Sequence, residues 1–181
     1  MKILLILLLL PLIAASILVA IYNRIVRLKN RADAAEGDIK ACLKQRHDLI
    51  PNLVNTAKGY MQYEKDLLEE IVELRSKAMQ SESPSPEIEG QLSRALGRIF
   101  ALAENYPELK ANTTFLKLQE ELSKVEETIQ KARRYYNATV RDYNNAVTTF
   151  PGVLVASIFN FKERDYFDIP EVEERAPEVR F

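Results

Sequence analysis

The sequence is poor in the residues that support disulfides, metal sites and tight turns. Its 181 residues include one cysteine, one histidine, five glycines and no tryptophan. One cysteine cannot form a disulfide within the chain, and one cysteine with one histidine leaves too few ligands for a transition-metal site. The scarcity of glycine favours a few long secondary-structure elements over many short ones. We therefore predict no bound metal and no cofactor.

Charge and motif content exclude several functional classes. The formal net charge is −1, so there is no basic excess of the kind that binds nucleic acid. No glycine-rich loop is present to hold a phosphate. Cys42 and His47 are five residues apart, which is a poor helical spacing for a nucleophile and its base, and no third orienting group is evident. We predict that the protein is not an enzyme and has no catalytic residue.

One long apolar run stands at the start of the chain. Residues 3–21 carry no charged side chain, and a helix of this length spans roughly 28 Å, close to the thickness of a bilayer's hydrocarbon core. The sequence thus predicts a membrane helix over residues 1–22. A cleavable signal peptide is the alternative, with a small-residue site at residues 14–16. Because the run stays apolar up to Ile21, we expect the helix to be retained.

Basic residues after the apolar run bear on topology. Arg24, Arg27, Lys29 and Arg31 follow it, against Lys2 before it. The positive-inside rule therefore favours a cytoplasmic body on a single-pass protein. The side of the membrane that the body faces stays open.

The remaining chain shows helical periodicity. Apolar residues recur in steps of three and four over residues 25–78, 88–102 and 115–150. Arg46 occupies one position in the first of these stripes, and Pro51 is expected to kink that helix. Loops are predicted at residues 81–86 and 105–107, and Pro151 with Gly152 is expected to end the last helix. This pattern predicts an all-α fold, with an elongated antiparallel bundle of long helices over residues 23–152.

The end of the chain changes in character. Residues 153–170 begin with an apolar stretch too short to span a bilayer, and we expect a capping segment that folds back as a short helix. The alternative is an exposed surface for oligomer contacts or for the membrane. Residues 171–181 are charged and contain proline, so a flexible tail is expected there.

Several long motifs point to one family. They are LKQRHDLIPNLV at residues 43–54, AENYPELKAN at 103–112, FLKLQEEL at 115–122 and ARRYYN at 132–137. In order and spacing the sequence resembles the LemA family of bacterial envelope proteins over nearly its whole length. One departure is Glu36, where many members carry tryptophan.

The resemblance implies a short N-terminal tail, one membrane helix in the bacterial inner membrane and a helical body without established enzymatic activity. Members often lie beside genes for membrane metalloproteases, and a magnetosome-membrane protein belongs to the family. We therefore predict a membrane-anchored structural or adaptor protein that forms homo-oligomers through its long helices. The alternative is a regulatory partner of a membrane protease or another envelope enzyme.

Polar, aromatic and proline residues of the motifs are expected to have structural roles. They are Asn23, Asn30, Arg46, His47, Asp48, Pro51, Asn52, Tyr106, Pro107, Arg133, Tyr136, Asn137, Tyr143, Asn144 and Pro151. Pro51 lacks an amide N–H, so Arg46 or Asn52 is expected to satisfy the carbonyl that loses its partner. The four asparagines other than Asn52 are expected to fix the register between helices.

A second expectation concerns the arginine pair in the last helix. Tyr136 is predicted to be buried, while Arg133 and Arg134 are solvated or paired with a facing acidic stripe. That stripe comprises Asp66, Glu69 and Glu73.

Overall fold

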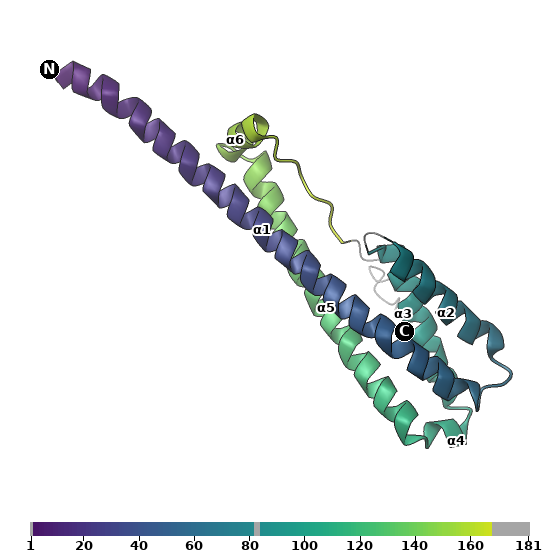
Figure 1. Cartoon of the computed structure of the whole chain (residues 1–181). Helices are drawn as coiled ribbons and strands as arrows, with labels where there is room; N and C mark the ends of the chain where they lie inside the picture. The colour runs from purple at the N-terminus through teal and green to yellow at the C-terminus, as the bar shows by residue number, and fades with distance from the viewer. Residues whose placement is uncertain (1, 82–83, 168–181) are drawn as a thin grey trace, which may run out of the picture. The chain divides into compact units, whose positions relative to one another are not determined.

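A computed structural model describes residues 2–81 and 84–167, with side chains from Leu9 onward (Figure 1). This part of the chain contains six helices and no strand, which confirms the all-α prediction. The helices are α1 (Lys2–Lys58), α2 (Lys65–Gln80), α3 (Pro86–Ala103), α4 (Pro107–Lys110), α5 (Thr113–Thr148) and α6 (Gly152–Phe159). The predicted flexible tail at residues 171–181 lies outside the described residues.

The chain divides into two compact units. Among the described residues, the bundle unit comprises residues 39–81, 84–132 and Phe167, and the terminal unit comprises residues 2–38 and 133–166. The bundle unit contains the end of α1, all of α2, α3 and α4, and the start of α5. The terminal unit contains the start of α1, the end of α5, and α6. Each unit has its own hydrophobic core.

Four helical segments surround the core of the bundle unit. The chain reverses at each connection between them, and α2 and α3 lie side by side (Figure 1). Their apolar stripes meet in one cluster, whose fully buried members include Ile50, Leu53, Ala57, Ile71, Leu92, Ile99 and Phe115. Burial of these stripes is what stabilises helices that would be marginal in isolation.

The prediction of one continuous helix over residues 25–78 is wrong, because the chain turns after Lys58. The amides of Tyr60 and Met61 both bond the carbonyl of Ala57, at 3.0 and 2.9 Å. Met61 is completely buried in the core. The apolar spacing continues across the turn because the end of α1 and the whole of α2 face the same core. By contrast, α1 runs through Pro51 without interruption.

Local capping groups mark the starts of α3 and α5. The Ser85 hydroxyl accepts a bond from the amide of Ile88 at 3.5 Å, and Pro86 occupies the first helical position. The Asn112 side chain accepts bonds from the amides of Thr114 and Phe115, at 2.9 and 3.1 Å. These caps satisfy amides that have no partner inside the helix. Loops are found at Ser81, at residues 84–85 and at residues 104–106, and the last residue of each expected loop, Pro86 or Pro107, is the first residue of a helix.

The buried stripe of α1 is wider than the predicted seam. Leu43 and Ile50 are buried, whereas Cys42 and Leu49, which the spacing of three residues from Ile39 and from Arg46 places in the stripe, are half-buried. A helix that packs against several neighbours buries a broader face than a two-stranded coiled coil does. At the other end of the predicted pattern Phe150 lies beyond α5 and is 81 % exposed.

In the terminal unit, α6 packs onto α1 and α5. Its Val155 and Ala156 join Ile25, Tyr143 and Val147 in the unit's core. The polypeptide turns from α5 into α6 through a cis Phe150–Pro151 bond and Gly152, and α6 ends at Asn160 in the left-handed conformation, with φ 56°. A side chain at position 152 would overlap the backbone carbonyl of α5 at residue 146, so glycine is required for this close approach. The predicted stop at residues 151–152 is confirmed.

Candidate functional site

A buried charged cluster lies inside the bundle unit. Arg46 of α1 is completely buried, and Glu89 of α3 is 1 % exposed. Side chains of this kind are almost never fully buried unless they are paired. Because Arg46 occupies a position in the apolar stripe of its helix, its permanent positive charge lies in the core, where it requires negatively charged partners.

Arg46 joins three helices. Its Nη2 donates to the carboxylate of Glu89, and its Nη1 donates to Glu126 Oε2 of α5 and to Ser93 Oγ of α3, both at 2.7 Å. The Ser93 hydroxyl in turn lies 2.8 Å from the other carboxylate oxygen of Glu126. The planar guanidinium therefore holds α1, α3 and α5 in one register.

His47 extends the cluster. Its Nε2 lies 3.2 Å from Glu89 Oε1 and 3.3 Å from Glu89 Oε2. The residue is 7 % exposed. Burial alone raises the pKa of the Glu89 carboxyl. The hydrogen bond with His47 and the charge of Arg46 outweigh burial, and they hold that pKa below its ordinary value of 4.5. Glu89 is therefore ionised at neutral pH.

The fourth helix is attached through a backbone carbonyl. The carbonyl of His47 would normally accept a bond from the amide four residues later, but that residue is Pro51. Arg75 Nε of α2 donates to this carbonyl at 2.6 Å. The expected donors were Arg46 and Asn52, and this expectation is wrong: Arg46 is held by carboxylates and Asn52 is exposed.

A cavity of about 300 Å³ reaches the edge of the cluster. His47 and Glu89 contribute to its wall, together with Lys40, Leu43, Lys44, Asp48, Ala78, Met79, Ser81 and Pro84. A histidine–carboxylate pair beside a cavity is one element of acid–base chemistry. Two other polar lining residues, Asp48 and Lys44, pair with each other on the surface of α1 at 2.8 Å. In the described part of the chain, no three histidine, cysteine or acidic side chains converge as a metal site requires.

In the terminal unit, a second polar network fastens the segment that follows α6. The Asn144 side chain donates to the carbonyl of Arg164 and accepts from its amide, both at 2.9 Å. Tyr143 and Tyr136 donate to the carbonyls of Lys162 and Asp165, at 2.8 and 3.1 Å. Asn144 thus binds an extended segment rather than a facing helix, contrary to the expectation for the asparagines.

Arg164 completes this second network. Its guanidinium pairs with Asp33 and, at 3.0 Å, with Glu36 of α1. Burial lowers the pKa of Arg164, but the hydrogen bond and charge of Asp33, with further help from Glu36, raise it above its ordinary value. Glu36, the position where the family pattern often has tryptophan, is therefore a salt-bridge partner here.

Other motif residues occupy varied surroundings. Asn23 and Asn30 are exposed on α1, and Asn137 is half-buried. Tyr106 lies 3.4 Å from Glu64, and Pro107 is the first residue of α4. Tyr136 is buried as predicted.

The two arginines of the pair lie in different surroundings. Arg133 is 6 % exposed and so is not solvated, whereas Arg134 is exposed. Of the proposed acidic stripe, Glu73 pairs with Lys77 in its own helix at 2.7 Å.

Comparison with known proteins decides the family. The sequence profile of the LemA family matches residues 35–181. The chain belongs to the LemA family. It is 27 % identical over 154 residues to Protein LemA of Metamycoplasma hominis, covering 83 % of this chain and 70 % of that protein. The predicted resemblance is confirmed.

Magnetosome proteins are also similar to this LemA-family chain. It is 23 % identical over 174 residues to Magnetosome protein MamQ of Magnetospirillum gryphiswaldense, and 22 % identical to MamQ 2 of Paramagnetospirillum magneticum. In both comparisons 81 % of this chain is covered, and it spans 64 % of the relative, a little under two thirds. The described part of the chain has one helix, α1, that is long and apolar enough to cross a membrane.

Sequence reasoning missed Glu89, Ser93, Glu126, Arg75 and Arg164 as members of the two networks. One signal was present for the first cluster. Glu89 and Ser93 are four residues apart beside the apolar stripe of α3, so they share a helix face. A buried arginine in the apolar stripe of one helix predicts an acidic partner beside the apolar stripe of another helix.

Proposed function

We propose that this LemA-family protein is a membrane-anchored structural or adaptor protein without catalytic activity. The apolar start of α1 serves as a retained anchor in the bacterial inner membrane, and the charge rule favours a cytoplasmic body. The observation that carries the proposal is the use of the polar motif residues. Arg46 and His47 bind the carboxylates that connect helices, and Tyr143 and Asn144 bind backbone groups.

The chemistry of the buried cluster supports a structural role over an enzymatic one. Both Nη atoms of Arg46 donate hydrogen bonds within the cluster. The Ser93 hydroxyl lies 2.8 Å from a carboxylate oxygen of Glu126 and 3.1 Å from the backbone carbonyl oxygen of Glu89. A nucleophile must instead be free to approach a substrate, with its base within hydrogen-bond reach. Apart from Arg46 Nε, which is buried without a hydrogen-bond partner, the polar atoms at the centre of this cluster bond to each other.

We also propose that copies of the protein associate through the bundle unit. A groove of about 390 Å³ runs between α3 and α5, with Leu96, Phe100 and Leu122 among its apolar lining residues. Its polar lining residues are Ser93, Ser123, Glu126, Glu127 and Gln130. Gly97 leaves this groove open, since a Cβ built there meets no atom within 4 Å. An apolar groove with a polar rim suits an incoming helix.

Filling the groove tests self-association. Gly97→Leu places a side chain in it, while Gly37→Leu is the matched control, because Gly37 is also helical and open. We expect the full-length wild type and Gly37→Leu in detergent to be oligomeric by light scattering, and Gly97→Leu to be smaller. A wild type that is strictly monomeric would refute self-association. Copurification of a stoichiometric membrane protease would instead support the regulatory-partner function.

A further inference from the structure

The surface of α6 has an unusual composition. Residues 143–161 contain no charged side chain, between Asp142 on one side and Lys162 on the other. Within this stretch several large apolar residues stay exposed, although α6 already buries Val155 and Ala156 in the core of its unit. We call these exposed residues the α6 surface; they are Phe150 (81 %), Val153 (39 %), Leu154 (57 %), Ile158 (68 %) and Phe159 (47 %).

The α6 surface lies next to the end of the apolar run of α1. The Tyr22 ring, which follows the last residue of that run, lies 4.7 Å from the ring of Phe159 and 5.7 Å from that of Phe161. Ile21 and Tyr22 also pack against the core that holds α6. All these residues belong to the terminal unit, so their arrangement is that of one compact body.

The height of α6 relative to a bilayer follows from helix geometry. Tyr22, whose ring contacts Phe159 of α6, lies about 1.5 Å beyond Ile21 along α1, and Ile25, buried in the same core as Val155 and Ala156, lies about 6 Å beyond it at ~1.5 Å per residue. The headgroup layer adds roughly 5–8 Å on each side of the hydrocarbon core. If α1 spans a membrane up to Ile21, α6 lies within the depth of that layer.

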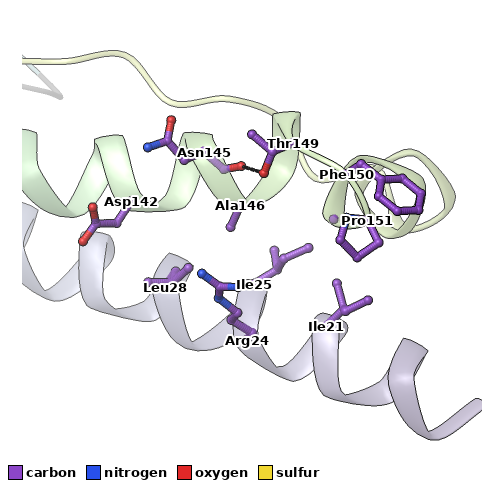
Figure 2. Close-up of a pocket in the computed structure, with 11 residues that line it drawn as sticks. Ile21, Arg24, Ile25, Leu28, Asp142, Asn145, Ala146, Thr149, Phe150 and Pro151 are labelled. Carbon is purple, nitrogen blue, oxygen red and sulfur yellow. Dashed lines mark hydrogen bonds between the residues drawn. The ribbon is translucent and has the colours of Figure 1, made fainter.

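A cavity beside α6 adds polar groups at the same level. It has a volume of about 420 Å³ and lies between α1 and α5, with Phe150 and Pro151 at the turn into α6 (Figure 2). Arg24 extends into the space between the two helices, and Asp142 stands on the α5 side (Figure 2). One basic and one acidic side chain in the lining match a zwitterionic headgroup.

We propose that the α6 surface docks onto the phospholipid bilayer, in the leaflet that α1 enters, as a second membrane contact of the protein. The proposal rests on the membrane anchor of the proposed function. A short helix with apolar residues on its outward side inserts at the headgroup–acyl boundary, where aromatic rings are favoured. The bilayer is the occupant, rather than a second copy, because the surface is continuous with the end of the anchor.

Depth measurements on the full-length protein in phosphatidylethanolamine–phosphatidylglycerol liposomes test this proposal. In a Cys42→Ser background, one cysteine at a time carries an environment-sensitive fluorophore, with lipids spin-labelled at shallow or deep positions as quenchers. Ile158→Cys reports the α6 surface. Tyr135→Cys is the matched control, because Tyr135 is 52 % exposed on α5 and lies roughly 20 Å along the helix from its end. Leu12→Cys reports the anchor.

The expected result is a blue-shifted emission at position 158 that shallow spin labels quench, with an unshifted and unquenched control at position 135. Deep labels should quench position 12. An unquenched position 158 beside a quenched position 12 overturns the docking proposal while the anchor stands. An unquenched position 12 overturns the anchor itself. A blue shift at position 158 that only dilution of the protein in lipid removes would assign the surface to a second copy, and the proposal would be wrong.

Discussion

Removing the negative charge of Glu89 should strongly destabilise the bundle unit. Glu89→Gln keeps the size of the side chain but leaves the buried Arg46 with Glu126 as its remaining carboxylate partner. Breaking a buried ion pair by neutralising one partner costs about 3–5 kcal/mol. The Glu126 side chain is 31 % exposed and still neutralises part of the charge, so we expect a loss near the lower limit, about 3 kcal/mol.

A surface pair in the same unit is the control. Glu70 of α2 and Arg98 of α3 are 3.0 Å apart, with 43 % and 59 % of their side chains exposed. Glu70→Gln removes an equivalent charge, but exposed ion pairs contribute only about 0–1 kcal/mol. Both substitutions therefore change glutamate to glutamine opposite an arginine, and they differ chiefly in burial.

Thermal unfolding of the full-length chain in detergent, followed by far-UV circular dichroism, measures the difference. For a chain of this size 1 kcal/mol shifts the Tm by about 2–4 °C, so Glu89→Gln should lower the Tm by roughly 6–12 °C. Glu70→Gln should lower it by no more than about 4 °C. Equal shifts for the two variants would refute the view that the buried cluster holds the helices together.

Three further predictions follow from the same contacts. The folded-state pKa of Glu89 is depressed, so its contribution to stability is present above its unfolded pKa of 4.5 and is lost as the pH falls through the folded value. Below pH 4.5 the free energy of unfolding of Glu89→Gln should therefore fall less steeply with decreasing pH than that of the wild type, which acid-unfolding curves measure. Arg75→Met should cost about 1–3 kcal/mol in chemical denaturation, because the carbonyl that Pro51 leaves without a donor loses its partner. The cost should shrink in a Pro51→Ala background, and a double-mutant cycle with no coupling would contradict this reasoning. Gly152→Ala should lower the Tm because its Cβ overlaps a backbone carbonyl of α5, whereas Gly37→Ala, in open space on α1, should be neutral or stabilising.

Much of the helical architecture of this LemA-family protein is determined by local sequence. The apolar run at residues 3–21, the Ser-Pro loop before α3 and the cap at Asn112 each act within a few residues, so they can be recognised without the fold. The buried position of Arg46 is also visible, because it interrupts an apolar seam at the correct spacing. The end of α5 before Pro151 follows from the missing amide and the adjoining glycine.

Only the tertiary structure decided which residues of these helices contact each other. The turn after Lys58 is invisible in the periodicity, because α1 and α2 present their apolar faces to one core. Arg46 finds its carboxylates 43 and 80 residues away, and Arg75 reaches a carbonyl 28 residues away. Asn144 binds an extended segment that no helical pattern predicts. Spacing within one helix defines a face, but the partner of that face is set by the packing of distant helices.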